Sequence, residues 1–160
     1  MIKKIILFII IITFSLSCDY SPIHSNKENN IEINIINMSG NSEINDYLSK
    51  ELKRKSKSSS EKIKVKINTD FSKRILAKNT KSFATDYELR VIGDFELKKG
   101  DKSKTFTISE KFRYKNQNDN YEQSNYETMI KKNLIKTIVN KLILRINSFE
   151  WLKNHMKLKI

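Results

Sequence analysis

An alternation of apolar and charged residues over positions 83–97 constrains this chain more than any other feature. Every second residue from Tyr87 to Leu97 is apolar, with Gly93 as the one gap, and the residues between them are mostly charged. Side chains of a β-strand point alternately to its two faces, so the pattern predicts a long strand with one buried and one solvated face. The following KKGDK, residues 98–102, predicts a tight hairpin turn, because glycine takes a positive φ at little cost.

Three other segments share this period of two, which is typical of half-buried strands. In the last of them Glu110 stands where an apolar residue is expected, which fits a bulge or an exposed end of the strand. The apolar positions are Ile31, Ile33 and Ile35 in the first segment, Ile63, Val65 and Ile67 in the second, and Phe106, Ile108, Phe112 and Tyr114 in the third.

Two segments show the helical period instead. Residues 42–55 have an acidic start and a basic end, as the helix dipole favours. A longer helix is predicted to begin at a capping box formed by Ser124 and Glu127. The apolar stripes are Ile44, Tyr47, Leu48 and Leu52 in the first helix, and Ile130, Leu134, Ile135, Ile138, Val139, Leu142, Ile143 and Ile146 in the second.

The order β-α-β-β-β-α predicts an α+β fold. A helix between the first two strands implies that they pair in parallel, and the remaining strands form an antiparallel meander. We therefore expect a two-layer sandwich, with a four-stranded mixed sheet and both helices on one face. This single domain spans residues 31–149, and residues 150–160 are expected to form a frayed basic tail.

The N-terminal segment is typical of an export signal. Two lysines precede an apolar run from Ile5 to Leu16, which is too short to cross a bilayer as a helix. Residues 1–17 therefore form a signal peptide, and residues 18–30, which are polar and hold the only proline, form a tether.

Cys18 is the only cysteine and directly follows the apolar run. A disulfide lacks a second cysteine, and the two histidines, His24 and His155, lie at opposite ends of the chain, which disfavours catalysis and metal binding. The position resembles the lipobox of bacterial lipoproteins, although Ser15 and Leu16 reverse the usual order. We interpret Cys18 as a lipidation site; the alternative is an ordinary cleaved signal peptide with an incidental cysteine.

The formal net charge of +13 indicates attraction to polyanions. An exported protein rarely meets nucleic acid, so an anionic membrane glycolipid is the expected partner. No nucleophile motif, glycine-rich phosphate loop or metal motif occurs in the sequence. We therefore expect no enzymatic activity, no metal and no cofactor.

The start of the mature chain and its layout resemble one family. The mature chain starts with residues that resemble the Cys-Gly-Phe-x-Pro-Leu/Ile-Tyr start of the LPS-assembly lipoprotein LptE family, above all of its alphaproteobacterial members. The residues that match in kind are Cys18, Tyr20, Pro22 and Ile23. At two positions the chain departs from this pattern: Asp19 replaces the glycine, and His24 stands where tyrosine is common. The order of elements also resembles the family. INDYLSKELKRK corresponds to the family's first helix, TKSFATDYELRVIGDFEL to its long third strand, and QSNYETMIKKNLIKTIVNKLILRI to its C-terminal helix.

The resemblance implies an outer-membrane lipoprotein on the periplasmic face. Such a protein is a plug and partner of the β-barrel translocon LptD, assists lipopolysaccharide assembly at the cell surface, and contacts lipopolysaccharide through basic residues. Asp19 directly after the lipidated cysteine would be compatible with retention in the inner membrane.

Four basic residues are the candidate lipopolysaccharide site: Lys73, Arg74, Lys78 and Lys81. They are predicted to lie in a polar connection between the second and third strands, where several cationic donors could meet phosphate groups. The alternative is a solvated basic loop. Two other functions stay open: an auxiliary lipoprotein of a phospholipid ABC transport system, and a lipid-anchored module that binds an anionic polymer.

Overall fold

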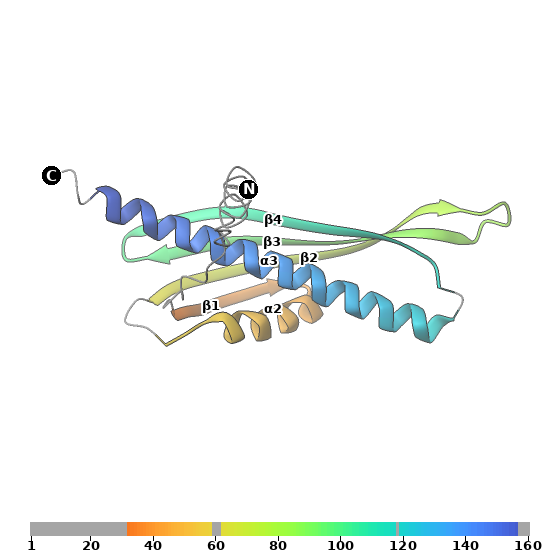
Figure 1. Ribbon diagram of the computed structural model, residues 1–160, viewed down its shortest axis with the longest axis horizontal. Helices are drawn as coiled ribbons and strands as arrows, with labels where there is room; N and C mark the ends of the chain where they lie inside the picture. The colour runs from red at the N-terminus through yellow and green to blue at the C-terminus, as the bar shows by residue number, and fades with distance from the viewer. Residues whose placement is uncertain (1–31, 59–61, 118, 157–160) are drawn as a thin grey trace, which may run out of the picture.

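The computed structural model describes residues 32–58, 62–117 and 119–156. The signal peptide, the tether, Cys18 and Asp19 lie outside these residues. The elements follow the order β1 (Glu32–Gly40), α2 (Ser42–Lys55), β2 (Lys62–Lys78), β3 (Ala84–Lys99), β4 (Lys102–Lys115) and α3 (Asn120–Met156) (Figure 1).

The four strands form one mixed sheet in the order β1-β2-β3-β4. β1 and β2 are parallel, whereas β2, β3 and β4 are successively antiparallel. Both helices lie on the same face of the sheet, with α3 running along much of its length (Figure 1). The predicted α+β sandwich is therefore confirmed. We call the covered side the inner face and the uncovered side the outer face.

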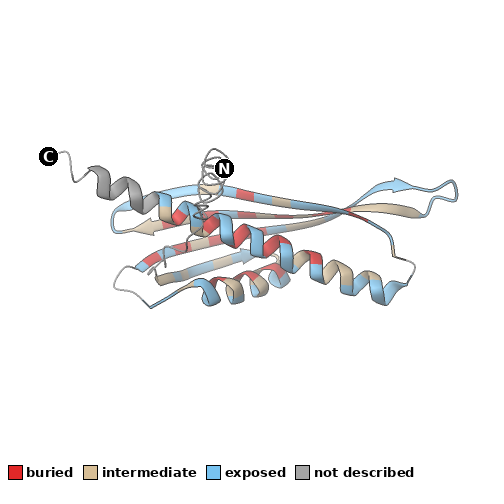
Figure 2. Ribbon diagram, viewed as in Figure 1, coloured by how far each residue is buried: buried red, intermediate tan, exposed pale blue. Residues whose placement is uncertain are grey.

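The hydrophobic core lies between the inner face and the helices. The alternating apolar residues of β3 are buried, as the sequence predicted, and Leu89, Val91 and Leu97 are 0% exposed. The helix stripes supply the other layer, so that buried residues follow one side of α2 and α3 (Figure 2). Tyr87, Phe106 and Phe71 pack against the margin of this core.

The connection from β1 to α2 depends on Gly40. Its φ is 93°, and a Cβ at this position would lie 1.8 Å from the carbonyl oxygen of Thr69. Only glycine fits such an approach of backbone to backbone. Asn41 follows as the N-cap of α2, with its side chain accepting a hydrogen bond from the amide of Ile44 at 3.0 Å. The MSGN sequence thus fixes where the first strand ends and the first helix begins.

The structure corrects three local expectations. β2 continues to Lys78, beyond the polar residues that had indicated a loop. Phe71 and Ile75 place two more apolar residues on the inner face of this strand. α3 begins at Asn120 rather than at Ser124: Asp119 accepts hydrogen bonds from the amides of Tyr121 and Glu122 at 2.7 and 3.0 Å, as an N-cap does.

Glu110 is the third correction. The β3–β4 register runs unbroken past it, so it marks neither a bulge nor a strand end. Glu110 instead faces the helices and pairs with Lys141 of α3. At the other end of α3, the helix continues to Met156 through most of the segment where a frayed tail was expected.

Candidate functional site

The most concentrated group of charges in the described residues is on the outer face, where three strands bring arginines around one glutamate. Arg74 of β2 and Arg113 of β4 are both register partners of Glu88 in β3. Arg90 lies two residues farther along β3, on the same face. We call Arg74, Arg90 and Arg113 the arginine cluster. The chain has only five arginines among its 31 basic residues, so three of the five meet here.

Glu88 holds the cluster together. Its carboxylate accepts hydrogen bonds from Nη2 of Arg74 at 2.6 Å and from Nε of Arg113 at 3.0 Å, and Nη2 of Arg90 lies at 3.4 Å. The Glu88 side chain is 1% exposed, although it lies on the face without helices, because the arginines cover it. A buried carboxylate is tolerated only when it is paired in this way.

The arginines also keep Glu88 ionised. Hydrogen bonds from Arg74 and Arg113 lower the pKa of Glu88 from 4.5 to about 2, against the opposing effect of desolvation. Nearby Lys111, the register partner of Arg90, acts in the same direction. Glu88 is therefore negative at neutral pH, and it orients the guanidinium groups without neutralising all of them.

The cluster retains capacity for an external anion. Arg74, Arg90, Arg113 and Lys111 carry four positive charges around Glu88, and the carboxylates that flank the cluster on the same face are Asp70 of β2 and Asp86 of β3, so positive charge remains in excess. The side chains of Arg74 and Arg113 are 57% and 67% exposed. Each guanidinium has five N–H donors, of which Glu88 uses only one or two. The arrangement is suited to phosphate or carboxylate groups, which arginine binds through paired hydrogen bonds.

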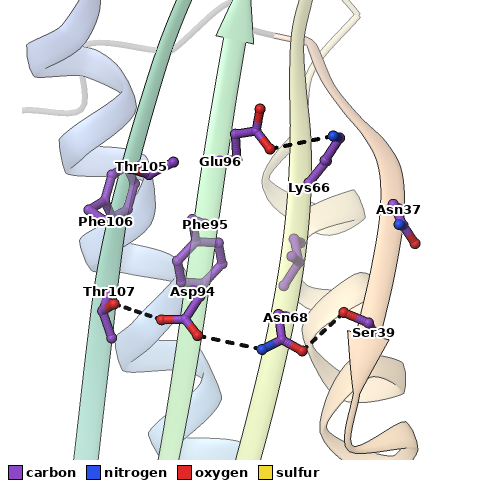
Figure 3. A pocket seen from close by; sticks show the side chains of 11 residues that line it. Asn37, Ser39, Lys66, Asn68, Asp94, Phe95, Glu96, Thr105, Phe106 and Thr107 are labelled. Carbon is purple, nitrogen blue, oxygen red and sulfur yellow. Dashed lines mark hydrogen bonds and ion pairs between the residues drawn. The ribbon is translucent and has the colours of Figure 1, made fainter.

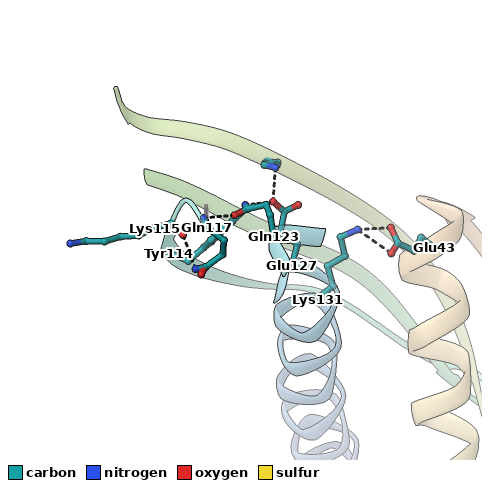
Figure 4. A network of polar contacts seen from close by, with 8 residues as sticks. Glu43, Tyr114, Lys115, Gln117, Gln123, Glu127 and Lys131 are labelled. Atoms are coloured by element: carbon teal, nitrogen blue, oxygen red, sulfur yellow. Dashed lines mark hydrogen bonds and ion pairs between the residues drawn. The ribbon is translucent and has the colours of Figure 1, made fainter. Parts of the chain in front are cut away.

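Lys73, by contrast, reaches the start of α3 and bonds to Glu127 there. Figure 4 shows Glu127 in a polar network with Tyr114 and Gln123. Glu127 accepts hydrogen bonds from Nζ of Lys73, the hydroxyl of Tyr114 and the side-chain Nε2 of Gln123, each at 2.6 Å. The Lys73 ammonium also lies 4.4 Å from the centre of the Tyr87 ring. Lys73 thus attaches β2 to α3, and its charge is compensated.

Burial raises the pKa of Glu127, but hydrogen bonds from Lys73, Tyr114 and Gln123 outweigh it and lower the pKa below its ordinary value. Burial and the contact with Glu127 raise the pKa of Tyr114. The hydroxyl of Tyr114 therefore stays protonated and donates to Glu127. This network is structural, since it joins the last strand to the helix that follows.

The four basic residues of the sequence prediction are not brought together. Lys73 and Arg74 are neighbours in β2 and point to opposite faces of the sheet. Lys78 ends β2, and Lys81 lies in the turn that leads to β3, so both are at the tip of the β2–β3 hairpin. Only Arg74 belongs to the arginine cluster.

Arg90, Arg113 and Glu88 were missed because they are far from Arg74 in the sequence. A signal for part of the cluster was present. A two-residue turn at Gly100 and Asp101 places Lys99 opposite Lys102, and counting back along both strands places Glu88 opposite Arg113. The pairing of Arg74 with Glu88 required the true length of β2, which the sequence did not reveal.

A second feature of the outer face is an open hollow of about 420 Å³ nearer the other end of the sheet (Figure 3). A row of polar side chains crosses all four strands there: Thr107 contacts Asp94 at 2.6 Å, Asp94 contacts Asn68 at 3.5 Å, and Asn68 contacts Ser39 at 3.0 Å. These groups satisfy one another. Lys66, which also lines the hollow, pairs with Glu96 at 3.5 Å. The hollow is therefore a solvated sheet surface whose polar side chains mostly contact one another.

Two absences hold for the described part of the chain. No group of three or more histidine, cysteine, aspartate or glutamate side chains could hold a metal ion among these residues. None of the helices within residues 32–58, 62–117 and 119–156 is both long and apolar enough to span a bilayer.

Comparisons with known proteins agree with this fold. Residues 29–146 match the family described as "LptE: Lipopolysaccharide-assembly". This match covers well over half of the chain, and the protein belongs to that family. Membership supports a role in lipopolysaccharide assembly for a lipoprotein of this type. No curated protein matches the sequence.

Two solved structures are similar to this chain at low sequence identity. Rare lipoprotein B from Shewanella oneidensis has a TM-score of 0.59 at 14% identity, and the alignment covers 76% of this chain and 100% of that one. Lipoprotein B from Nitrosomonas europaea has a TM-score of 0.49 at 15% identity, with coverage of 78% and 88%. The Shewanella protein therefore supports the fold of this chain.

Proposed function

We propose that this protein is a lipid-anchored partner of an LptD-like outer-membrane β-barrel and that it contacts lipopolysaccharide directly during assembly at the cell surface. Family membership supports the assembly role. The observation that carries the direct contact is the arginine cluster on the outer face, which is assembled on Glu88 and retains exposed donors. Its role is binding and positioning, not catalysis.

The chemistry of the cluster fits the phosphate groups of lipopolysaccharide. Several planar guanidinium groups held at fixed positions can bind a phosphate with less loss of side-chain freedom than mobile lysines can. Of the four residues that the sequence indicated, Arg74 keeps this role. Lys78 and Lys81 remain available at the hairpin tip, whereas Lys73 is paired with Glu127.

The anchor in this proposal is Cys18, which would carry acyl chains on the periplasmic face of the outer membrane. The described chain enters the sheet at Glu32, next to Lys62 and at the end opposite the β2–β3 hairpin. Mass spectrometry of the N-terminal peptide tests the anchor. We expect a mature chain that begins at an acylated Cys18, and an unmodified thiol there would contradict it.

The direct contact is tested with the triple variant Arg74→Gln, Glu88→Gln and Arg113→Gln. It removes two exposed positive charges together with the buried carboxylate that they cover, and it leaves Arg90, whose side chain is 34% exposed, as the one remaining arginine of the cluster. Because hydrogen bonds to charged groups contribute about 1.5–3 kcal/mol each, we expect binding to purified lipopolysaccharide to fall about tenfold or more.

The matched control is Lys104→Gln, an exposed lysine of β4 away from the cluster. It changes the net charge by the same single unit as the triple variant. We expect it to bind lipopolysaccharide as the wild-type protein does. Equal affinities for the wild-type protein and a folded triple variant would contradict the role of the cluster.

A further inference from the structure

The sheet has two edges, and the one formed by β4 is the more open. In the described part of the chain β4 pairs only with β3, and this register runs without a shift over the whole strand. The other edge strand, β1, is shorter and has a register shift between Ile35 and Asn37. The amide of Ile33 in β1 also donates a hydrogen bond to Oγ of Ser56 at 2.9 Å. Short and bulged edge strands resist pairing with another chain, and β4 is neither short nor bulged.

The hydrogen-bond pattern determines which backbone groups of β4 point away from the sheet. Asn116, directly after β4, donates its amide hydrogen to the carbonyl of Thr85 at 2.8 Å. Because hydrogen-bonded and non-hydrogen-bonded pairs alternate in an antiparallel ladder, the even-numbered residues of β4 bond to β3. The odd-numbered residues from Ser103 to Lys115 therefore direct their N–H and C=O groups outward, where a further strand could pair with them.

An apolar side chain beside this edge is half exposed. Phe112 is the register partner of Leu89 and lies on the inner face, yet it is 44% exposed. Ile108 and Tyr114, on the same face of the same strand, are only 4% and 6% exposed. Because β4 is the last strand of the sheet, an apolar side chain of an added strand would lie beside the Phe112 ring and bury it.

The outer face of the same edge is basic. Lys111, Arg113 and Lys115 occupy successive odd positions of β4, so their side chains share the outer face. Glu110 is the one carboxylate of β4, and it points to the inner face and pairs with Lys141. A second copy of this edge would bring like charges together, which is unfavourable. An acidic strand is complementary to it.

We propose that β4 binds an extended acidic segment of another polypeptide by strand addition. In this arrangement the segment pairs with the outward backbone groups of β4, as in other cases of β-augmentation. Its carboxylates lie beside Lys111 and Lys115 on the outer face, and its apolar side chains lie beside Phe112 on the inner face. The expected ligand is therefore a strand in which acidic and apolar residues alternate. Binding of this strand does not require lipopolysaccharide.

The probe is a dye-labelled synthetic peptide of about ten residues in which glutamate and valine alternate, which is the length of a long strand. It is titrated with the full chain in detergent, without lipopolysaccharide, and binding is followed by fluorescence anisotropy. One comparison peptide has glutamine in place of glutamate, and another has the same composition with its glutamates and valines in separate blocks. We expect the alternating acidic peptide to bind about tenfold or more tighter than either.

Two variants separate the backbone contribution from the charge contribution. Ser109→Pro removes one outward N–H group, and proline is tolerated where the N–H group of an edge strand points away from the sheet. We expect it to weaken binding of the acidic peptide about tenfold or more, whereas Ser109→Ala, the matched control, should bind as the wild-type protein does. Lys111→Gln with Lys115→Gln should reduce binding of the acidic peptide to the level of the glutamine peptide. All three positions are exposed, and circular dichroism verifies that each variant folds.

Amide hydrogen exchange of the wild-type protein, measured by NMR, gives a readout that does not depend on any variant. Saturating acidic peptide should slow exchange several-fold at the amides of Ser109 and Lys111, which point outward. The amides of Ile108 and Glu110, which already bond to β3, should change little. A ligand held only by the lysine side chains would not produce this alternation.

Equal binding of the three peptides would overturn the proposal. So would full binding by a folded Ser109→Pro variant, or peptide binding without alternating protection of the β4 amides. Arg74, Glu88 and Arg113 are unchanged in these variants and no lipopolysaccharide is present. A negative result here therefore leaves the binding test of the arginine cluster unaffected, and failure of that test leaves this one unaffected.

Discussion

At the scale of single residues, Glu88 is the buried charged side chain of the described residues. A carboxylate on the solvated face of a sheet is ordinarily exposed, yet Glu88 is covered by Arg74, Arg90 and Arg113. Its burial is a consequence of the ion pairs, since neither α2 nor α3 lies over that face. The stability of the sheet around the arginine cluster therefore depends on the protonation state of Glu88.

This link predicts a dependence of stability on pH. The pKa of Glu88 is 4.5 in the unfolded reference and about 2 in the fold, so its contribution is fully present above pH 4.5 and is lost as the pH falls toward 2. Glu88→Gln should therefore lower the unfolding temperature at pH 7, because three arginines lose their counter-charge. The difference from wild type should shrink as the pH approaches 2.

Thermal unfolding between pH 7 and pH 2 measures this difference. Asp101→Asn, in the exposed β3–β4 turn, serves as the control for the removal of one negative charge. We expect the control to follow wild type over the whole range. A difference between Glu88→Gln and wild type that stays constant with pH would show that the effect is not due to ionisation of Glu88.

At the scale of elements, the sequence predicted β3, β4 and both helix stripes well, because their apolar periodicity is dense, with single gaps only at Gly93 in β3 and Glu110 in β4. Ile44, Leu48 and Leu52 of α2 are all buried as expected. The sequence did not predict the second half of β2, which carries Ser72, Lys73 and Arg74. In that half the alternation of apolar and polar residues is broken. Lys73 and Arg74 are stabilised by Glu127 of α3 and Glu88 of β3, partners that local sequence patterns do not contain.

The start of α3 gives a second prediction at this scale. Ser-x-x-Glu at Ser124 resembled a capping box, but Glu127 accepts hydrogen bonds from Lys73, Tyr114 and Gln123, and Asp119 caps the helix. Asp119→Ala should lower the free energy of unfolding by about 1 kcal/mol, as loss of an N-cap typically does. Ser124→Ala should change it by less than about 0.5 kcal/mol.

Urea unfolding of the two alanine variants distinguishes these roles. Both substitutions remove one polar side chain from an exposed position, which makes them a matched pair. A larger loss of stability for Ser124→Ala than for Asp119→Ala would restore Ser124 as the N-cap. The same measurement thus decides between the start expected from the sequence and the start seen in the structure.

At the scale of the whole molecule, the long strands separate the candidate sites along one axis (Figure 1). The 17 residues of β2 extend about 55 Å at about 3.3 Å per residue. Glu32, the first described residue, lies at one end of this axis beside Lys62, and the tip of the β2–β3 hairpin forms the other end. The arginine cluster lies between them, nearer the tip, since Arg74 is four residues from the end of β2.

The central claim is that this lipoprotein assists lipopolysaccharide assembly as the partner of a β-barrel, and one measurement tests it most directly. The full chain, carrying a C-terminal affinity tag, is captured from detergent-solubilised membranes, and its partners are identified by mass spectrometry. We expect a large outer-membrane β-barrel protein with lipopolysaccharide. The triple variant Arg74→Gln, Glu88→Gln and Arg113→Gln should retain the barrel and lose most of the lipopolysaccharide. Capture of an ATPase complex of phospholipid transport in place of the barrel would contradict the account.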